Sequence, residues 1–263
     1  MNVSYDYSGR TAFVTGAGSG IGRASAIAFG AAGANVAVSD IAEPGGLETV
    51  ELIRAAGGTA EFFQLDVADV VGVERTVAAV VDRFGGLDVA HNNAGIESEH
   101  VPFADSTVDD WRRVVEIDLN AVYYCIRAEV AVMRRRGGGA IVNTASAAGL
   151  FAGYHSGPYT TAKHGLVGLT RSAAVDHAKD GIRVNAVCPG GVDTPFVGEV
   201  PAPVMQRLML GIPMKRLATP EEVAAGVLWL ASDGASYVNG VALPIDAGLT
   251  ILSAGTDFSD LDL

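Results

Sequence analysis

The sequence predicts an α/β protein with one doubly wound parallel sheet and helices on both faces. Short apolar segments typical of buried strands alternate with longer segments of helical periodicity or Ala-rich composition, and the connections are mostly short. A glycine-rich turn also joins the first strand to the first helix, as in nucleotide-binding sheets. Seven strands are expected, at residues 10–15, 35–39, 60–65, 87–91, 140–145, 182–187 and 241–245.

The expected helices lie between these strands. The clearest is residues 69–84, where valines recur at helical spacing and indicate one buried face. No composition break, low-complexity tract or internal repeat divides the chain, so residues 1–263 are predicted to form one domain. The other helices are expected after Gly22, over 45–56, 108–133 and 159–179, and from Pro220 to Trp229 or Leu230.

Composition limits the classes of function. The chain of 263 residues is 49% apolar and 18% charged, which allows a large core and argues against disorder. Its net charge of −12 argues against nucleic-acid or anionic-membrane partners. The uncharged run 137–162 is too rich in Gly, Ser, Thr and Asn for a membrane helix. No leader opens the chain, and Cys125 and Cys188 lie in apolar contexts that predict buried thiols, so a cytoplasmic location is expected.

The turn after the first strand has the pattern T-G-x-x-x-G-x-G, with Gly16, Gly20 and Gly22. Backbone N–H groups and the helix dipole at such a turn can hold a pyrophosphate, and glycines let it approach. The second strand then ends at Asp40, which could accept hydrogen bonds from an adenosine ribose and would repel a 2′-phosphate. Neither Ser19 nor Ile41 is basic, so NAD(H) is predicted over NADP(H); the alternative for Asp40 is a capping or turn aspartate.

The candidate chemistry lies in the segment GYHSGPYTTAK, where Tyr159 and Lys163 are four residues apart. On a helix this spacing places both side chains on one face, and an adjacent ammonium lowers the pKa of a phenol. Ser146 follows the expected strand 140–145 and could donate to the same reacting oxygen. Taken singly, each feature has an ordinary alternative: a ring packed on a lysine stem, or a turn-forming serine.

Other kinds of site lack support. The five histidines form no H-E-x-x-H motif and no cluster with cysteine, so no metal site is predicted. No G-x-S-x-G motif surrounds Ser146, which argues against a hydrolase triad. No pair of carboxylates is singled out for glycosidic chemistry.

Taken together, the motifs resemble the short-chain dehydrogenase/reductase family. The segments TGAGSGIG, Asp66, NNAG, Ser146 with YTTAK, and PGGVDT occur in the family's order between about residues 9 and 250. The resemblance implies a Rossmann-type sheet of about seven strands and a dimeric or tetrameric NAD(P)-dependent oxidoreductase acting on alcohols or carbonyls. A homotetramer is the expected assembly, formed partly by the helices 108–133 and 159–179.

The resemblance also implies roles for individual residues. The pyrophosphate and adenosine would be held by the glycine turn, Asp40 and Ile41 would meet the ribose, and Asp66 with the Val67 amide would meet the adenine. The NNAG residues would line the cofactor cleft or tie strands together; the two roles remain open. The cofactor-binding residues implied are Gly16, Ser19, Gly20, Ile21, Gly22, Asp40, Ile41, Asp66, Val67, Asn93, Ala94, Gly95, Tyr159, Lys163, Pro189, Gly190, Val192 and Thr194.

One position departs from the family pattern. Where most relatives have an asparagine that helps hold a water linking the lysine to solvent, this chain has Asp118, and Asn120 follows two residues later. Residues two apart on a helix do not share a face, so Asn120 is not expected to substitute. Asp118 is therefore predicted to take the asparagine's place in the catalytic set with Ser146, Tyr159 and Lys163.

Substrate contacts are expected from loops that follow the strands. Residues 196–217 are interpreted as a lid that excludes water from hydride transfer, and the acidic tail 253–263 is given no role. An apolar or cyclic substrate is predicted. The proposed pocket residues are Ile96, Ala147, Ala148, His155, Gly191, Phe196, Met205 and Met209.

The function predicted is NAD(H)-dependent interconversion of a secondary alcohol and a ketone, with Tyr159 as acid or base. One alternative is an NADPH-dependent 3-oxoacyl-thioester reductase acting on acyl carrier protein, which Asp40 and the net charge of −12 disfavour. The other is a non-catalytic dinucleotide-binding protein, which the presence of Ser146, Tyr159 and Lys163 disfavours.

Overall fold

A computed structural model describes residues 4–197, 205–206 and 209–252. Its centre is one sheet of seven parallel strands in the order β3-β2-β1-β4-β5-β6-β7. The order reverses beside β1, which is the switch point where doubly wound sheets bind ligands. The strands are β1 (Thr11–Thr15), β2 (Asn35–Asp40), β3 (Thr59–Gln64), β4 (Val89–Asn92), β5 (Gly139–Thr144), β6 (Ile182–Pro189) and β7 (Ala242–Ile245).

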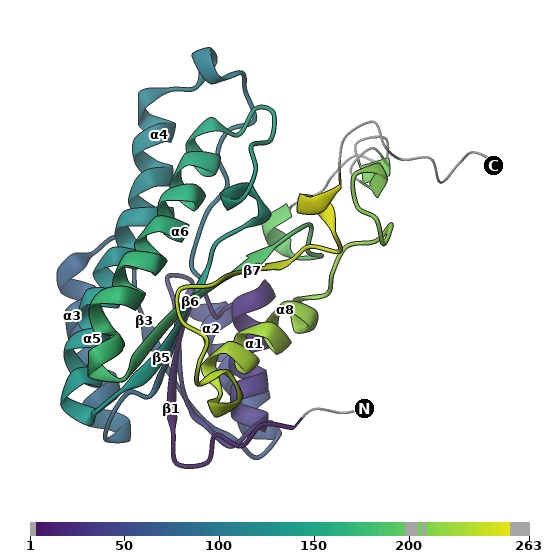
Figure 1. The fold of residues 1–263 in the computed structure, drawn as a ribbon. Helices are drawn as coiled ribbons and strands as arrows, with labels where there is room; N and C mark the ends of the chain where they lie inside the picture. The colour runs from purple at the N-terminus through teal and green to yellow at the C-terminus, as the bar shows by residue number, and fades with distance from the viewer. Residues whose placement is uncertain (1–3, 198–204, 207–208, 253–263) are drawn as a thin grey trace.

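Helices cover both faces of the sheet (Figure 1). One layer contains α1 (Gly20–Ala31), α2 (Glu43–Ala55) and α8 (Pro220–Ala231), with α1 packed between the other two. The opposite layer contains α3 (Val70–Phe84), α4 (Val108–Val115), α5 (Ala121–Arg136) and α6 (Gly157–His177). The doubly wound parallel fold predicted from the sequence is confirmed.

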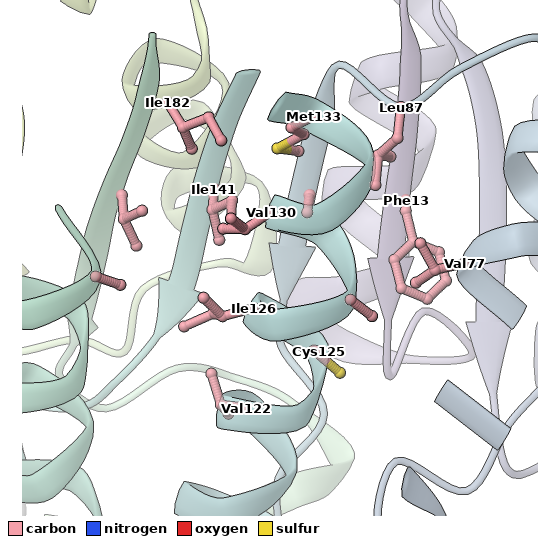
Figure 2. Packing of buried hydrophobic residues seen from close by; sticks show 14 of the residues in the cluster. Phe13, Val77, Leu87, Val122, Cys125, Ile126, Val130, Met133, Ile141 and Ile182 are labelled. Atoms are coloured by element: carbon pink, nitrogen blue, oxygen red, sulfur yellow. The ribbon is translucent and has the colours of Figure 1, made fainter. Parts of the chain in front are cut away.

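Each face of the sheet has its own apolar core. Under α3, α5 and α6, the α5 side chains Ile126 and Met133 pack with Ile141 of β5, while Val77 of α3 lies beside Phe13 of β1 (Figure 2). Cys125 belongs to the same cluster and is a free, buried thiol, as is Cys188. Because central strands such as β1 and β6 are buried on both sides, their sequences are largely continuous apolar runs rather than alternating ones.

The expected helix 108–133 differs from the observed one in the middle. Its two α-helical parts, α4 and α5, are joined by a π-helical turn at Glu116–Asn120. Such turns insert one extra residue and change the direction in which neighbouring side chains point. Sequence periodicity did not predict this turn, which contains Asp118.

None of the helices in the described ranges is long and apolar enough to cross a membrane. Within the uncharged run 137–162, the chain forms β5, a short 3-10 turn and the start of α6. Part of the expected lid 196–217 is not described, since residues 198–204 and 207–208 lie outside the described ranges, as does the acidic tail 253–263.

Candidate active site

A cleft of about 720 Å³ opens at the carboxyl ends of the strands. Strand register brings these ends to one edge, since Thr15 pairs with Ser39 and Asn92 with Asn143. Parallel sheets bind ligands at this edge. The lining residues come from strand ends and the segments that follow them, from the helical turn Glu116–Asn120 and from α6: Gly16, Ser19, Gly20, Ile21, Ser39, Asp40, Ile41, Leu65, Asp66, Val67, Asn93, Ala94, Gly95, Ile96, Glu97, His100, Ile117, Thr144, Ala145, Ser146, Tyr159, Lys163, Pro189, Gly190, Gly191, Val192, Thr194 and Phe196.

The glycine turn at one end of the cleft suits a dinucleotide pyrophosphate. The first turn of α1 has no acidic residue, and the Ser19 hydroxyl does not cap it, so its N–H groups lack a side-chain partner there. Such N–H groups, with the helix dipole, attract an anion. Gly16 has φ +61°, and a Cβ there would lie 2.9 Å from the Ala94 Cα, so a side chain would not fit between the turn and NNAG.

Gly22 has a different role from the other predicted cofactor residues. It does not line the cleft, although all seventeen others do. A Cβ at Gly22 would lie 2.1 Å from the Gly16 carbonyl oxygen, so this glycine lets α1 pack closely against the turn. The pattern T-G-x-x-x-G-x-G did not separate a ligand-facing glycine from a packing glycine.

Asp40 lines the cleft and is also tied to the backbone. Its Oδ2 accepts from the Gly18 N–H at 2.8 Å, and its Oδ1 accepts from the Ala42 N–H at 2.8 Å. The turn role considered from the sequence is therefore present, and it fixes the carboxylate beside the glycine turn. Arg23, a nearby cation, donates to Glu48 at 2.6 Å and to Thr49 at 3.1 Å, so its guanidinium is already engaged.

The NNAG segment ties strands together while lining the cleft. The Asn93 amide donates to the carbonyl oxygens of Thr15 and Gly16, both at 3.3 Å, and its Oδ1 accepts from the Thr144 hydroxyl at 3.1 Å. These bonds join the ends of β1, β4 and β5. Asn92 points the other way, into the core, and donates to Glu129 at 3.0 Å.

Ser146, Tyr159 and Lys163 meet at the other end of the cleft. Ser146 begins a 3-10 turn after β5, and Tyr159 lies in the first turn of α6, just after Pro158. The Lys163 Nζ lies 5.4 Å from the centroid of the Tyr159 ring and donates to the Thr144 carbonyl oxygen at 3.2 Å. Asp118 does not line the cleft, but its Oδ2 lies 3.5 Å from the Lys163 Nζ.

The environment shifts the ionisation of these groups. Burial raises the pKa of Tyr159, and the attraction of Lys163 together with a hydrogen bond from Ser146 only partly opposes this. The expectation of a lowered phenol pKa is therefore wrong for the protein alone, because sequence reasoning counted the charge and omitted burial. Burial favours neutral Lys163, yet Asp118 and Tyr159 outweigh this and leave its pKa raised.

The cleft also contains residues that the motifs did not indicate. Glu97, His100 and Ile117 line it near the reacting groups. Burial raises the pKa of the Glu97 carboxyl, which accepts from the Ser98 N–H at 3.2 Å. Their position after NNAG, at the carboxyl end of β4, was the only available signal for Glu97 and His100.

The expected substrate pocket is only partly reproduced. Ile96, Gly191 and Phe196 line the cleft, and the Phe196 ring centroid lies 6.3 Å from that of Tyr159. Ala147 is buried in the 3-10 turn, while His155 is exposed with φ +62°. Neither of these two residues lines the cleft, and neither do the other three expected pocket residues, Ala148, Met205 and Met209. In the described ranges, no cluster of His, Cys, Asp or Glu has the arrangement of a metal site.

Comparison with known proteins identifies the family. Residues 16–250 match a family model described as Enoyl-(Acyl carrier protein) reductase. The chain belongs to the short-chain dehydrogenase/reductase family, whose members are oxidoreductases that use a nicotinamide dinucleotide.

Particular relatives are alike over nearly their whole length. The chain is 46% identical to cis-4-hydroxycyclohexanecarboxylate dehydrogenase of Sinomonas cyclohexanicum, over 92% of this chain and 96% of the relative. It is 41% identical to cyclohexanol dehydrogenase of an Acinetobacter species, over 94% and 98%. Among solved structures, levodione reductase superposes with a TM-score of 0.91 at 36% identity, covering 94% of this chain and 100% of that one.

Proposed function

We propose that this chain is an NAD(H)-dependent alcohol dehydrogenase and ketone reductase that acts on a ring-bearing secondary alcohol. The observation that carries the proposal is the cleft itself, which joins the glycine turn to Ser146, Tyr159 and Lys163. The relatives named for cyclohexanol and cis-4-hydroxycyclohexanecarboxylate support a cyclic substrate.

The proposed mechanism uses each of these side chains differently. Bound oxidised nicotinamide supplies the hydride acceptor and a positive charge that favours a phenolate. In alcohol oxidation, Tyr159 takes the hydroxyl proton, Ser146 donates a hydrogen bond to the substrate oxygen, and Lys163 stabilises the phenolate. The opposite proton movements accompany ketone reduction.

Cofactor selection is assigned to Asp40. Its carboxylate is held beside the glycine turn by Gly18 and Ala42 and would repel a 2′-phosphate. Arg23 is paired with Glu48 and is therefore poorly placed to offer a compensating charge. These contacts support NAD(H) over the NADPH of the alternative 3-oxoacyl-thioester reductase.

The residues at the substrate end of the cleft favour a substrate with an apolar, uncharged ring. Ile96, Ile117 and Phe196 supply apolar surface, while Glu97 would repel a carboxylate on the substrate. We therefore propose that cyclohexanol is a better substrate than a cyclohexanol bearing a carboxylate.

The chain is also proposed to form a homotetramer, since Tyr123 of α5 and Val175 of α6 are exposed apolar groups on helices suited to such contacts.

Fluorescence titration with NADH and NADPH tests the cofactor assignment. The wild type should bind NADH at least about tenfold more tightly, a difference of about 1.4 kcal/mol. The Asp40→Ala variant should lose most of that preference, and Asp82→Asn, at an exposed site on α3, should keep it. A wild-type preference for NADPH would contradict the assignment.

A substrate panel then separates the candidate functions. With the preferred cofactor, we expect turnover of cyclohexanol and of cyclohexanone in the reverse direction, and little turnover of a 3-oxoacyl thioester. Turnover of the thioester alone would support the reductase alternative. Tight NADH binding without turnover of any alcohol or ketone would support the non-catalytic alternative.

A further inference from the structure

Asp118 is enclosed beneath the cleft rather than exposed within it. Its exposed fraction is 0%, and it lies in the π-helical turn between α4 and α5. The preceding residue, Ile117, lines the cleft, whereas Asp118 does not. The turn therefore directs the carboxylate inward, toward α6, and the backbone of Gly95 and Ile96 passes beside it.

The two oxygens of Asp118 face different groups. Oδ1 accepts from the Ile96 N–H at 2.8 Å, and Oδ2 faces the Lys163 Nζ at 3.5 Å. Oδ2 has no hydrogen-bond partner in the described part of the chain. A Cβ on Gly95 would lie 3.1 Å from Oδ1 and 3.4 Å from Nζ, so the backbone closes tightly over the ion pair.

The charges around this pair come from several elements. Lys163 and Tyr159 lie on α6, Glu97 follows β4, and Arg113 lies on α4. Burial raises the pKa of Asp118, and Lys163 and Arg113, which favour its ionised form, only partly oppose this. The Asp118 charge in turn favours the ammonium of Lys163 and opposes a phenolate at Tyr159.

We infer that Asp118 is a buried counter-ion of Lys163 and acts as a positioning residue that holds the ammonium in place. Through Lys163 it also moves the pH range in which Tyr159 acts as a base to higher pH. This inference rests on the proposed role of Tyr159 as the acid or base. The family asparagine is neutral, whereas Asp118, in the ionised form that Lys163 favours, adds a negative charge in an enclosed, poorly solvated position. Tyr159 consequently stays protonated to higher pH, which favours ketone reduction near neutrality.

This inference differs from a role for Asp118 in holding a relay water. The Asp118 side chain is covered by Gly95 and Ile96, and its Oδ2 is directed at the Lys163 ammonium. Its effect is therefore electrostatic and acts through Lys163. Replacing the charge while keeping the shape should shift the pH profile rather than abolish activity.

The test is the pH profile of kcat/KM for alcohol oxidation in Asp118→Asn. This variant keeps the oxygen that accepts from Ile96, and the rising limb should move to lower pH by about one unit. Asp118→Ser, a second neutral replacement, carries the same expectation if the first variant does not fold. A limb that stays in place or moves to higher pH would overturn the inference.

Glu97→Gln is the matched control, because it removes another carboxylate that acts on Tyr159 and Lys163. Glu97 is only half-buried, so its shift should be in the same direction and smaller. A larger shift than that of Asp118→Asn would show that the enclosed pair does not dominate.

A second readout requires no turnover. The tyrosinate absorbance is followed as a function of pH in the wild type and in Asp118→Asn, each with and without Tyr159→Phe. In each background, the difference made by Tyr159→Phe isolates the ionisation of Tyr159. We expect Tyr159 to ionise at lower pH in the Asp118→Asn background, and an unchanged or higher midpoint would contradict the inference. Because this holds even if no alcohol is oxidised, it separates failure of the inference from failure of the proposed function.

Discussion

Two buried carboxylates on the same long helix have opposite surroundings. Asp118 and Glu129 both have exposed fractions of 0%. Asp118 faces the ammonium of Lys163. Glu129 has only the Asn92 amide, which donates to its Oε2 at 3.0 Å, and no ion pair to it occurs among the described residues. Burial raises the pKa of Glu129 to about 8, so this side chain is largely protonated near neutrality.

The difference shows what decides the role of a buried acid. Burial raises the pKa of Asp118 as well, but there it is opposed by a cation that also lies beside the reacting phenol, so the ionised form of Asp118 can influence chemistry. Glu129 belongs instead to a chain of amides, since Asn92 also donates to Asn143 at 3.1 Å, and Asn143 donates to Thr170 at 2.9 Å. That chain joins β4, β5 and α6, so Glu129 is expected to affect stability and leave catalysis unchanged.

Removing the Lys163 ammonium should leave Asp118, like Glu129, a buried carboxyl without a cation. We expect this change to have the largest effect on turnover and stability. In Lys163→Met, turnover should fall at least ~10²-fold because the phenolate loses its stabilising charge. The free energy of unfolding at pH 8 should fall by about 3 kcal/mol or more, as for other broken buried pairs. The loss should shrink at acid pH, where the unpaired carboxyl is protonated in the folded state.

Kinetics and denaturant unfolding at two pH values measure these effects. Lys179→Met, which removes an exposed lysine near the end of α6, serves as the control and should change neither property appreciably. Unchanged stability in Lys163→Met would contradict the enclosed ion pair.

Neutralising the other acid should have the opposite effect on stability and no effect on turnover. The folded pKa of Glu129 is about 8, above its ordinary value of 4.5, so the folded state binds a proton that the unfolded state releases. Stability is therefore full below about pH 4.5 and declines as pH rises toward 8. In Glu129→Gln this decline should disappear, with a gain of about 4 kcal/mol at pH 8 and unchanged turnover.

The Asn92 Oδ1, which has no partner in the described structure, can accept from the amide introduced in Glu129→Gln. Thermal unfolding across the pH range measures the effect, with Glu51→Gln on the exposed face of α2 as the control. A Glu129→Gln variant that is less stable than wild type at pH 8 would show that the carboxyl is ionised and favourably held in the folded state.

The sequence predicted features whose cause is local or periodic. The glycine turn, the seven strands and the helical spacing of Tyr159 and Lys163 are visible because backbone geometry and apolar periodicity restrict residue choice. The order of the motifs along the chain also led to the correct family. Strand limits differed by one or two residues, as for the fourth, expected at 87–91 and found at Val89–Asn92.

The features that sequence reasoning missed depend on tertiary contacts. The π-helical turn leaves no periodic trace over five residues, so the direction of Asp118 could not be predicted. The raised pKa of Tyr159 comes from burial, which is a sum over several elements. Glu97 and His100 follow a motif without belonging to it, so their place in the cleft became clear only from the fold.

The most direct test of the proposed dehydrogenase centre is the rate of NADH formation from cyclohexanol by Tyr159→Phe. We expect the rate to fall at least ~10²-fold with unchanged NADH binding, because the acid or base is removed and the rest of the cleft is kept. Tyr154→Phe, at an exposed tyrosine in the loop before α6, should retain wild-type turnover. Near-normal turnover of Tyr159→Phe would contradict the assignment of Tyr159, and with it the proposed mechanism.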